Sequence, residues 1–263
     1  MIIKYLILGV IQGFTEPLPI SSSGHLRIFK SIFNSEILSD MNFEIIVNFG
    51  SLIAILFLYR KEIFNIIKDF FLYLKTKNKK YEFNYKYVFL IILGTIPAAI
   101  SGLFIKDIIE KYFTTKLVGL MFIITALLLF MVKDIRGNKT MHDMTWKDAL
   151  KIGIFQILAL FPGISRSGAT VVGGMESNLT RETSLNYSFM LYIPISLASI
   201  ILGIKDLISS SSNLLLPYMI SMIVSCISTY FSAKLFIDIF KKGKLIYFSI
   251  YCFILGLLTF IML

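Results

Sequence analysis

Charged side chains are scarce in this 263-residue chain, at 16%, whereas hydrophobic residues make up 56% and the mean hydropathy is +0.79. Such a balance excludes an ordinary soluble domain. Cysteine occurs only twice, as Cys226 and Cys252 inside apolar runs, so neither a disulfide framework nor a cysteine metal site is indicated. Histidine also occurs only twice. The few polar residues that interrupt apolar segments therefore carry most of the functional information.

Long apolar runs are abundant, and several approach the roughly 20 residues that span a bilayer as a helix. Six spans are expected, at 43–59, 87–105, 117–132, 187–204, 214–233 and 245–263. The first and third are short, so their ends need interfacial Tyr, Lys or Arg. The apolar start, Met1 to Val10, is followed by Gln-Gly-Phe-Thr-Glu-Pro instead of a cleavage site, and we expect it to be retained.

Two segments, 9–25 and 153–168, share a pattern at a fixed offset of 144 residues, since 153 − 9 = 144. The matches include Gly9 with Gly153, Gln12 with Gln156, Ser21 with Ser165, and Gly24 with Gly168. The chain is therefore predicted to be a single membrane domain, 1–263, made of two related halves, 1–133 and 134–263. Each half opens with an apolar run broken by Pro, Gly and Ser. Such breaks at corresponding positions of two halves point to a binding site.

The net charge of +10 is concentrated in three intervals between spans, 60–86, 133–151 and 234–244. The intervals 106–116 and 205–213 carry few basic residues, and acids balance most of them. The Lys and Arg bias places the three rich intervals in the cytoplasm. The basic charge is thus a topology signal. A nucleic-acid partner is disfavoured, because no basic soluble face with interleaved aromatics is present.

This orientation places three spans in each half, and an odd number turns the second copy upside down. Segment 1–40 would enter from the outer face and return, whereas 152–185 would enter from the cytoplasm. Irregular backbone at membrane depth needs protein or a water-filled cavity around it, so the two tips should meet. The predicted fold class is an all-α integral membrane protein with an inverted-topology repeat. It has about six transmembrane helices plus two re-entrant helical hairpins that meet at a central site.

The tips are predicted to form an anion pocket, because Ser- and Gly-rich turns and helix N-termini present backbone N–H groups. Arg166 lies in the second turn, and its planar fork suits phosphate oxygens. Glu16 follows Gln12 by one helical turn, and together with substrate phosphates they can hold a divalent cation. The alternatives are a structural pair between Arg166 and Glu16, or a helix-end acid at Glu16 before Pro17.

His25 lies just past the Ser triplet and is a candidate general base, general acid or nucleophile, although a buried structural histidine is the alternative. Ser22 precedes it by three residues and aligns with Arg166 in the repeat. His142 lies in a polar stretch and is interpreted as surface. Five other hydroxyls are expected mainly to cap turns: Ser21, Ser23, Ser165, Ser167 and Thr170.

These motifs give the chain a resemblance to the undecaprenyl-diphosphate phosphatase family, the bacitracin resistance protein family. The segments that carry it are Gln12-Gly-Phe-Thr-Glu16, Pro19-Ile-Ser-Ser-Ser-Gly-His25 and Pro162-Gly-Ile-Ser-Arg-Ser-Gly-Ala-Thr170. The family pattern has Glu or Gln at position 12, Glu at position 16, and Pro-Gly-x-Ser-Arg-Ser-x-x-Thr in the second half. Pro17 is a departure, because the family commonly has an aromatic residue there. The resemblance covers nearly the whole chain.

The resemblance implies hydrolysis of undecaprenyl diphosphate to undecaprenyl phosphate and inorganic phosphate, which recycles the lipid carrier for cell-wall synthesis. It also implies a divalent cation, Mg²⁺ or Ca²⁺, held by Glu16 and Gln12, and a bacterial plasma-membrane location with the site open to the outer face. Arg166 would hold the diphosphate and stabilise developing charge. Ser22 or His25 would attack or activate water. The remaining substrate-binding residues would be Gln12, Ser165, Ser167 and Thr170.

Two other functions share some of these features. A secondary transporter, or a flippase of polyprenyl phosphate, also combines an inverted repeat with broken helices at the membrane centre. A scaffold protein would have no reason to place Arg166 and Glu16 at membrane depth. Chain-length preference, the identity of the metal and the oligomeric state, a homodimer included, are left open by the sequence.

Overall fold

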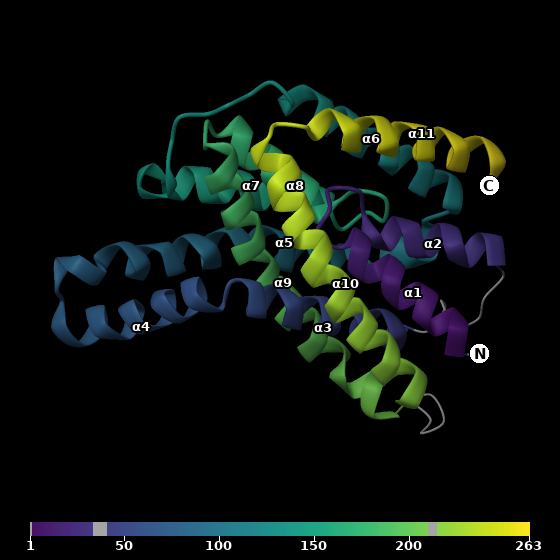
Figure 1. Cartoon of the computed structure of the whole chain (residues 1–263), viewed down its shortest axis with the longest axis horizontal. Helices are drawn as coiled ribbons and strands as arrows, with labels where there is room; N and C mark the ends of the chain where they lie inside the picture. Colours follow the sequence, from purple (N-terminus) through teal and green to yellow (C-terminus); the bar gives the residue numbers. More distant parts are fainter. Residues whose placement is uncertain (1, 34–40, 210–214) are drawn as a thin grey trace.

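The computed structural model describes residues 2–33, 41–209 and 215–263, and these are almost entirely helical (Figure 1). The α-helices are α1 Ile2–Thr15, α2 Ser22–Phe33, α3 Met41–Leu58, α4 Arg60–Thr76, α5 Glu82–Tyr112, α6 Thr115–Val132, α7 Trp146–Leu158, α8 Arg166–Glu176, α9 Arg181–Ser209, α10 Leu215–Lys241 and α11 Leu245–Met262. Two short 3-10 helices, η2 Lys79–Tyr81 and η3 Met141–Asp143, lie in the turns. Across the described ranges no β-strand forms.

The six predicted spans are confirmed as helices, α3, α5, α6, α9, α10 and α11. Five of these are long and apolar enough to cross a membrane, and α3 with α4 makes a sixth candidate, as a pair bent by 75°. The chain is therefore an all-α, multi-pass membrane protein. The first residue of the span at 214–233 lies outside the described residues, as do the first residue and the end of segment 1–40 and residues 210–213 of the interval 205–213.

The interval 60–86, expected only as a basic stretch between two spans, is mostly helical. It contains α4 and the start of α5, which pack together as a hairpin that extends from the rest of the molecule (Figure 1). These residues form a helix in spite of their many charges because the sequence of α4 is amphipathic. Ile63 and Ile66 recur at helical spacing on one face of α4, while Lys61 and Lys68 leave that face.

Both broken segments have the predicted form of two helices separated by a short turn. α1 and α2 flank residues 16–21, and α7 and α8 flank residues 159–165. The packing partners also correspond, because α1 packs against α10 as α7 packs against α5, and α6 packs against α11. These equivalences agree with two related halves. The inverted orientation of the halves in a membrane stays a prediction.

A stripe of small hydroxyl residues on α10 holds α1 and α3 in place. Ser221 donates to the Tyr5 carbonyl at 2.7 Å, Thr229 donates to the Gly13 carbonyl at 3.0 Å, and Ser225 donates to the Val47 carbonyl at 2.8 Å. Lipid tails are as apolar as the helices, so close packing and hydrogen bonds have to drive association. This stripe fixes the position of α1, and with it the position of the first tip.

Close backbone approach accompanies the stripe, and it gives a prediction at Gly9. A methyl group there would stand 2.7 Å from the backbone oxygen of Ser221, which cannot move without moving α10. We expect Gly9→Ala to destabilise the protein by about 1–3 kcal/mol, as overpacking does, measured as a lower midpoint of thermal unfolding in detergent. Gly102→Ala is the matched control, because its methyl group would meet only Leu160, at 3.6 Å. Equal stability of both variants would contradict the close packing of α1 on α10.

Candidate active site

The two turns between the broken helices lie against each other, as predicted. The Gly163 backbone N–H donates to Ser21 Oγ at 3.1 Å, and Ser167 Oγ donates to the Leu18 carbonyl at 3.0 Å. Thr125 of α6 closes the junction by donating to the Gly163 carbonyl at 2.9 Å. Backbone groups that would otherwise be unpaired inside the protein are thereby satisfied.

Ser21 and Ser165, which are equivalent in the repeat, both cap a helix. Ser165 is the N-cap of α8 and accepts from the Gly168 N–H at 3.1 Å. Ser21 accepts from the Gly24 N–H at 3.3 Å at the start of α2, and its φ of 65° lies in the left-handed region. These two serines confirm the expectation that hydroxyls cap the turns. The caps aim Ser22 and Arg166, the next residue in each case, toward the junction.

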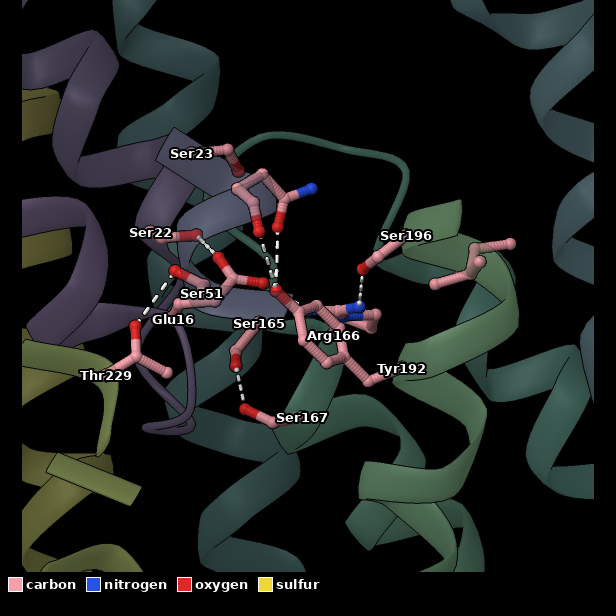
Figure 2. Close-up of polar contacts among 12 residues, drawn as sticks. Glu16, Ser22, Ser23, Ser51, Ser165, Arg166, Ser167, Tyr192, Ser196 and Thr229 are labelled. Atoms are coloured by element: carbon pink, nitrogen blue, oxygen red, sulfur yellow. Dashed lines mark hydrogen bonds and ion pairs between the residues drawn. The ribbon is translucent and has the colours of Figure 1, made fainter. Parts of the chain in front are cut away.

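Glu16 lies at the centre of the site, where both halves contribute to its environment (Figure 2). One carboxylate oxygen, Oε1, forms an ion pair with Arg166 Nη2. The other, Oε2, accepts from Ser22 Oγ and from Gln12 Nε2, the latter at 2.9 Å. The side chains of Glu16 and Arg166 are 10% and 20% exposed. A charge at this depth is costly unless it is paired, and these partners supply the pairing.

Three residues that the sequence reasoning missed support Arg166. Its guanidinium lies 3.8 Å from the ring centroid of Tyr192, as a cation–π contact, and Nη1 donates to Ser196 Oγ at 3.4 Å. The Tyr192 hydroxyl in turn donates to Asn48 Oδ1 at 2.8 Å. Asn48 and Tyr192 are separated by 192 − 48 = 144 residues, the repeat offset. They therefore occupy equivalent positions of the two halves, but their residue types differ and each lies in an apolar span, so the repeat does not single them out.

A small cavity of about 10 Å³ adjoins the ion pair and is lined by Glu16, Pro17, Ile55, Arg166, Ser167, Ser188, Phe189 and Tyr192. This volume has room for about one water molecule. A phosphate group is larger than this volume, so its binding here requires side chains of the lining to move. The lining also has an apolar part, which includes Ile55 and Phe189.

The structure does not bring His25 to this cluster. Its ring is directed toward α11, where Nε2 accepts from the Tyr251 hydroxyl at 2.6 Å, while Nδ1 donates to the Ser21 carbonyl at 2.7 Å. The ring also stacks on Tyr251 and meets Phe122 edge-on. This placement matches the alternative of a buried structural histidine, and a catalytic role for His25 stays a prediction.

The remaining predicted residues lie around the cluster rather than in it. Thr170 donates to the Arg166 carbonyl at 2.9 Å and shares a hydrogen bond with Ser188 Oγ at 2.6 Å, so it joins α8 to α9. Ser165 and Ser167 share a hydrogen bond at 3.1 Å beside the Leu18 carbonyl. Ser167 also lines the cavity. His142, interpreted as surface, is exposed and stacks on Phe83.

The described residues contain no group of three or more His, Cys, Asp or Glu side chains that could hold a metal ion. Glu16 is the single carboxylate at the junction. Gln12 donates its amide N–H to Glu16, and its amide also carries a carbonyl oxygen, a group that can serve as a metal ligand. Such a donor set fits a hard cation that takes most of its other ligands from phosphate and water.

Fold and site together define a multi-pass α-helical membrane protein with an acid, a hydroxyl and an arginine buried where two broken helices meet. A model of the family described as bacitracin resistance protein BacA matches residues 5–258. The chain belongs to this family, and the resemblance stated from the motifs is confirmed.

Relatives from bacteria align over the whole chain. Undecaprenyl-diphosphatase 1 of Bacillus licheniformis is 42% identical over 261 residues, which cover 98% of this chain and 96% of that protein. Undecaprenyl-diphosphatase of Oceanobacillus iheyensis is 40% identical over 267 residues, which cover 100% of this chain and 97% of that protein.

A double-mutant cycle tests the support of Arg166 by Tyr192. We expect Tyr192→Leu and Arg166→Met to be coupled by about 0.5–2 kcal/mol in unfolding free energy, the range of cation–π contacts. Tyr192→Phe is the control, because it keeps the ring and removes only the hydroxyl bonded to Asn48. Because the ring contact is kept, the coupling energy between Tyr192→Phe and Arg166→Met should be close to zero. Additive effects of Tyr192→Leu and Arg166→Met would mean that the ring does not stabilise the guanidinium.

Proposed function

We propose that this protein hydrolyses undecaprenyl diphosphate to undecaprenyl phosphate and inorganic phosphate, and so recycles a lipid carrier and confers bacitracin resistance. Family membership and the names of the aligned relatives support this activity. The observation that carries it is the sharing of one carboxylate, Glu16, between a hydroxyl, Ser22, and an arginine, Arg166. A nucleophile, a base and a phosphate-binding group are thereby within reach of one another.

Arg166 is the diphosphate-binding group in this proposal. Its fork can leave Glu16 and take two phosphate oxygens, because a dianionic phosphate offers a stronger partner than the shared carboxylate. Backbone N–H groups at the start of α8 lie beside it and favour negative charge. The same groups then stabilise the charge that develops on the transferred phosphoryl group.

Ser22 is the attacking group that the geometry favours, since its Oγ already donates to Glu16. As Oγ forms a bond to the terminal phosphorus, its proton passes to Glu16 and the bond to the bridging oxygen breaks. Undecaprenyl phosphate leaves with the electrons of that bond. Water then attacks the phosphorus of the phosphoserine as the bond from phosphorus to Oγ breaks. Glu16 returns its proton to Ser22 Oγ, and inorganic phosphate leaves with the oxygen and both hydrogens of the water. His25 is the alternative attacking or activating group, and it would first have to leave Tyr251.

A divalent cation, Mg²⁺ or Ca²⁺, is the proposed cofactor, with Glu16 and the amide oxygen of Gln12 as its protein ligands. When bound, it would neutralise charge on the diphosphate oxygens. Gln12 further orients Glu16 through their hydrogen bond. Replacing Gln12 should therefore weaken both the position of the carboxylate and the affinity for the cation.

The apolar surroundings of the site support a substrate with a lipid tail, and the distribution of lysines supports the location. Ile55 and Phe189 line the cavity beside the charged residues and can receive the first prenyl unit. We place the protein in the bacterial plasma membrane, with its Lys-rich hairpin of α4 and α5 in the cytoplasm and the site open to the outer face.

The decisive test is phosphate release from undecaprenyl diphosphate by purified protein in detergent, with and without a chelator. Hydrolysis proceeds in detergent, whereas transport or flipping needs a sealed membrane. Glu16→Ala and Arg166→Ala should each lower turnover by about 10²–10⁴-fold, and Arg166→Lys by at least about tenfold, because the bidentate fork is lost.

The double variant separates catalysis from folding. Glu16→Ala with Arg166→Ala should cost little more activity than either change alone, since the two residues act as one unit. It should also unfold at a higher temperature than either single variant, because neither charge is left unpaired. Independent, multiplicative losses of activity would contradict a shared site. Absence of phosphate release by the unaltered protein would overturn the proposed function.

The orientation has its own test, on a background in which Cys226 and Cys252 are replaced. A cysteine introduced at Lys116, at the start of α6, should react in whole cells with a membrane-impermeant thiol reagent. A cysteine at Lys80, in the turn between α4 and α5, should react only after lysis. Both lysines are exposed, so accessibility does not differ for structural reasons. Reaction at Lys80 in intact cells would invert the topology.

A further inference from the structure

A second and larger cavity, of about 360 Å³, lies between α4, the start of α5 and η3. It shares no lining residue with the cavity beside Arg166. Its polar lining comes from Glu62 and Asn65 of α4 and from Asn84 and Tyr87 of α5, with Phe83 and Met141 as apolar walls. A volume of this size is in the range of small-molecule sites, and the proposed hydrolysis does not use it.

Tyr87 provides the first sign that a ligand belongs here. Its side chain is 2% exposed, and within the described structure its hydroxyl has no hydrogen-bond partner. A buried hydroxyl without a partner costs free energy, and native proteins rarely leave one. The ring is held in place by stacking against Phe83, with centroids 6.0 Å apart. The hydroxyl oxygen itself is enclosed, and a polar group that enters the cavity far enough to reach it would satisfy it.

Two further polar groups of the cavity can accept hydrogen bonds, the Glu62 carboxylate and the Asn84 carbonyl oxygen. Among the described residues none forms a salt bridge with Glu62, although its side chain is only partly exposed. Asn84 donates its amide N–H to Asp69 at 2.6 Å, which leaves its carbonyl oxygen as an acceptor. A carboxylate without a salt bridge beside an amide oxygen is a suitable partner for a cationic donor of hydrogen bonds. Phe83 and Met141 suit the methylene groups next to such a cation.

The positive charge around the cavity limits the chemical class of the ligand further. The two helices and their turn are rich in lysine: Lys61, Lys68, Lys79, Lys80 and Lys86. This excess repels a free polyamine but favours a molecule that carries a phosphate beside its ammonium group. We infer that the cavity binds the ammonium group of a zwitterionic phosphate ester of a primary amino alcohol. Glu62 receives the ammonium, and the lysines attract the phosphate.

This chemistry occurs in an aminophospholipid headgroup and in the free phosphoamino alcohol, and calorimetric titration distinguishes the two. The probes are dihexanoylphosphatidylethanolamine and O-phosphoethanolamine, added to the full-length protein in detergent. Dihexanoylphosphatidylcholine is the chemical control, because its trimethylated nitrogen has no N–H to donate. Glu62→Gln should weaken binding by about tenfold or more, since a charged hydrogen bond is lost. Tyr87→Phe should weaken it several-fold, and Asp134→Asn, at a highly exposed acid, should leave it unchanged.

Binding of the lipid alone would identify a headgroup site, and binding of both probes would identify a site for the free zwitterion. Failure of both probes to bind would overturn the inference, as would equal affinity in Glu62→Gln, in Tyr87→Phe and in the unaltered protein. Phosphate release should be the same in Glu62→Gln as in the unaltered protein. The outcome at this cavity is therefore independent of the outcome at Glu16 and Arg166.

Discussion

Backbone that leaves a helix inside a membrane protein must find hydrogen-bond partners within the protein, and this structure is arranged around two such places. Each broken segment uses a serine, Ser21 or Ser165, to cap the helix that follows. The two turns then pair with each other, through Gly163 and Ser21. Neither turn could satisfy its buried backbone groups alone, so the caps and the junction are the requirement on which the site depends. The charged residues are positioned by them.

The ion pair between Glu16 and Arg166 serves both stability and chemistry. In the absence of ligand each residue neutralises the other, which makes two charges tolerable in a cavity with room for about one water molecule. In the proposed mechanism a phosphate ligand would compete for Arg166 and release Glu16 at the same time. Binding would then free the carboxylate next to Ser22 only when there is a substrate to act on.

Much of this arrangement could be predicted from the sequence, because hydrophobic length, repeated breaks and lysine asymmetry are strong one-dimensional signals. The six spans and the meeting of the two tips follow from them. Residues whose role depends on which helices touch could not be found this way. Tyr192 and Asn48 contact Arg166 or each other across α8, α9 and α3. The position of the His25 ring could not be read from the sequence either, because its place near Ser22 in the chain does not show that the ring faces Tyr251. Its catalytic role stays a prediction. The helix α4 was not predicted because its sequence contains more charged residues than a membrane span, and only one of its faces is apolar.

The repeat also has a consequence for the origin of the chain. At the offset of 144, Glu16 corresponds to Leu160 and Arg166 corresponds to Ser22, so opposite charges come from different halves and never from equivalent positions. A symmetric assembly of two first halves would bury two carboxylates and no arginine, and two second halves would bury two arginines. Two halves that carry different residues at these equivalent positions place one of each at the junction. The charge pair therefore depends on the difference between the halves and not on their likeness.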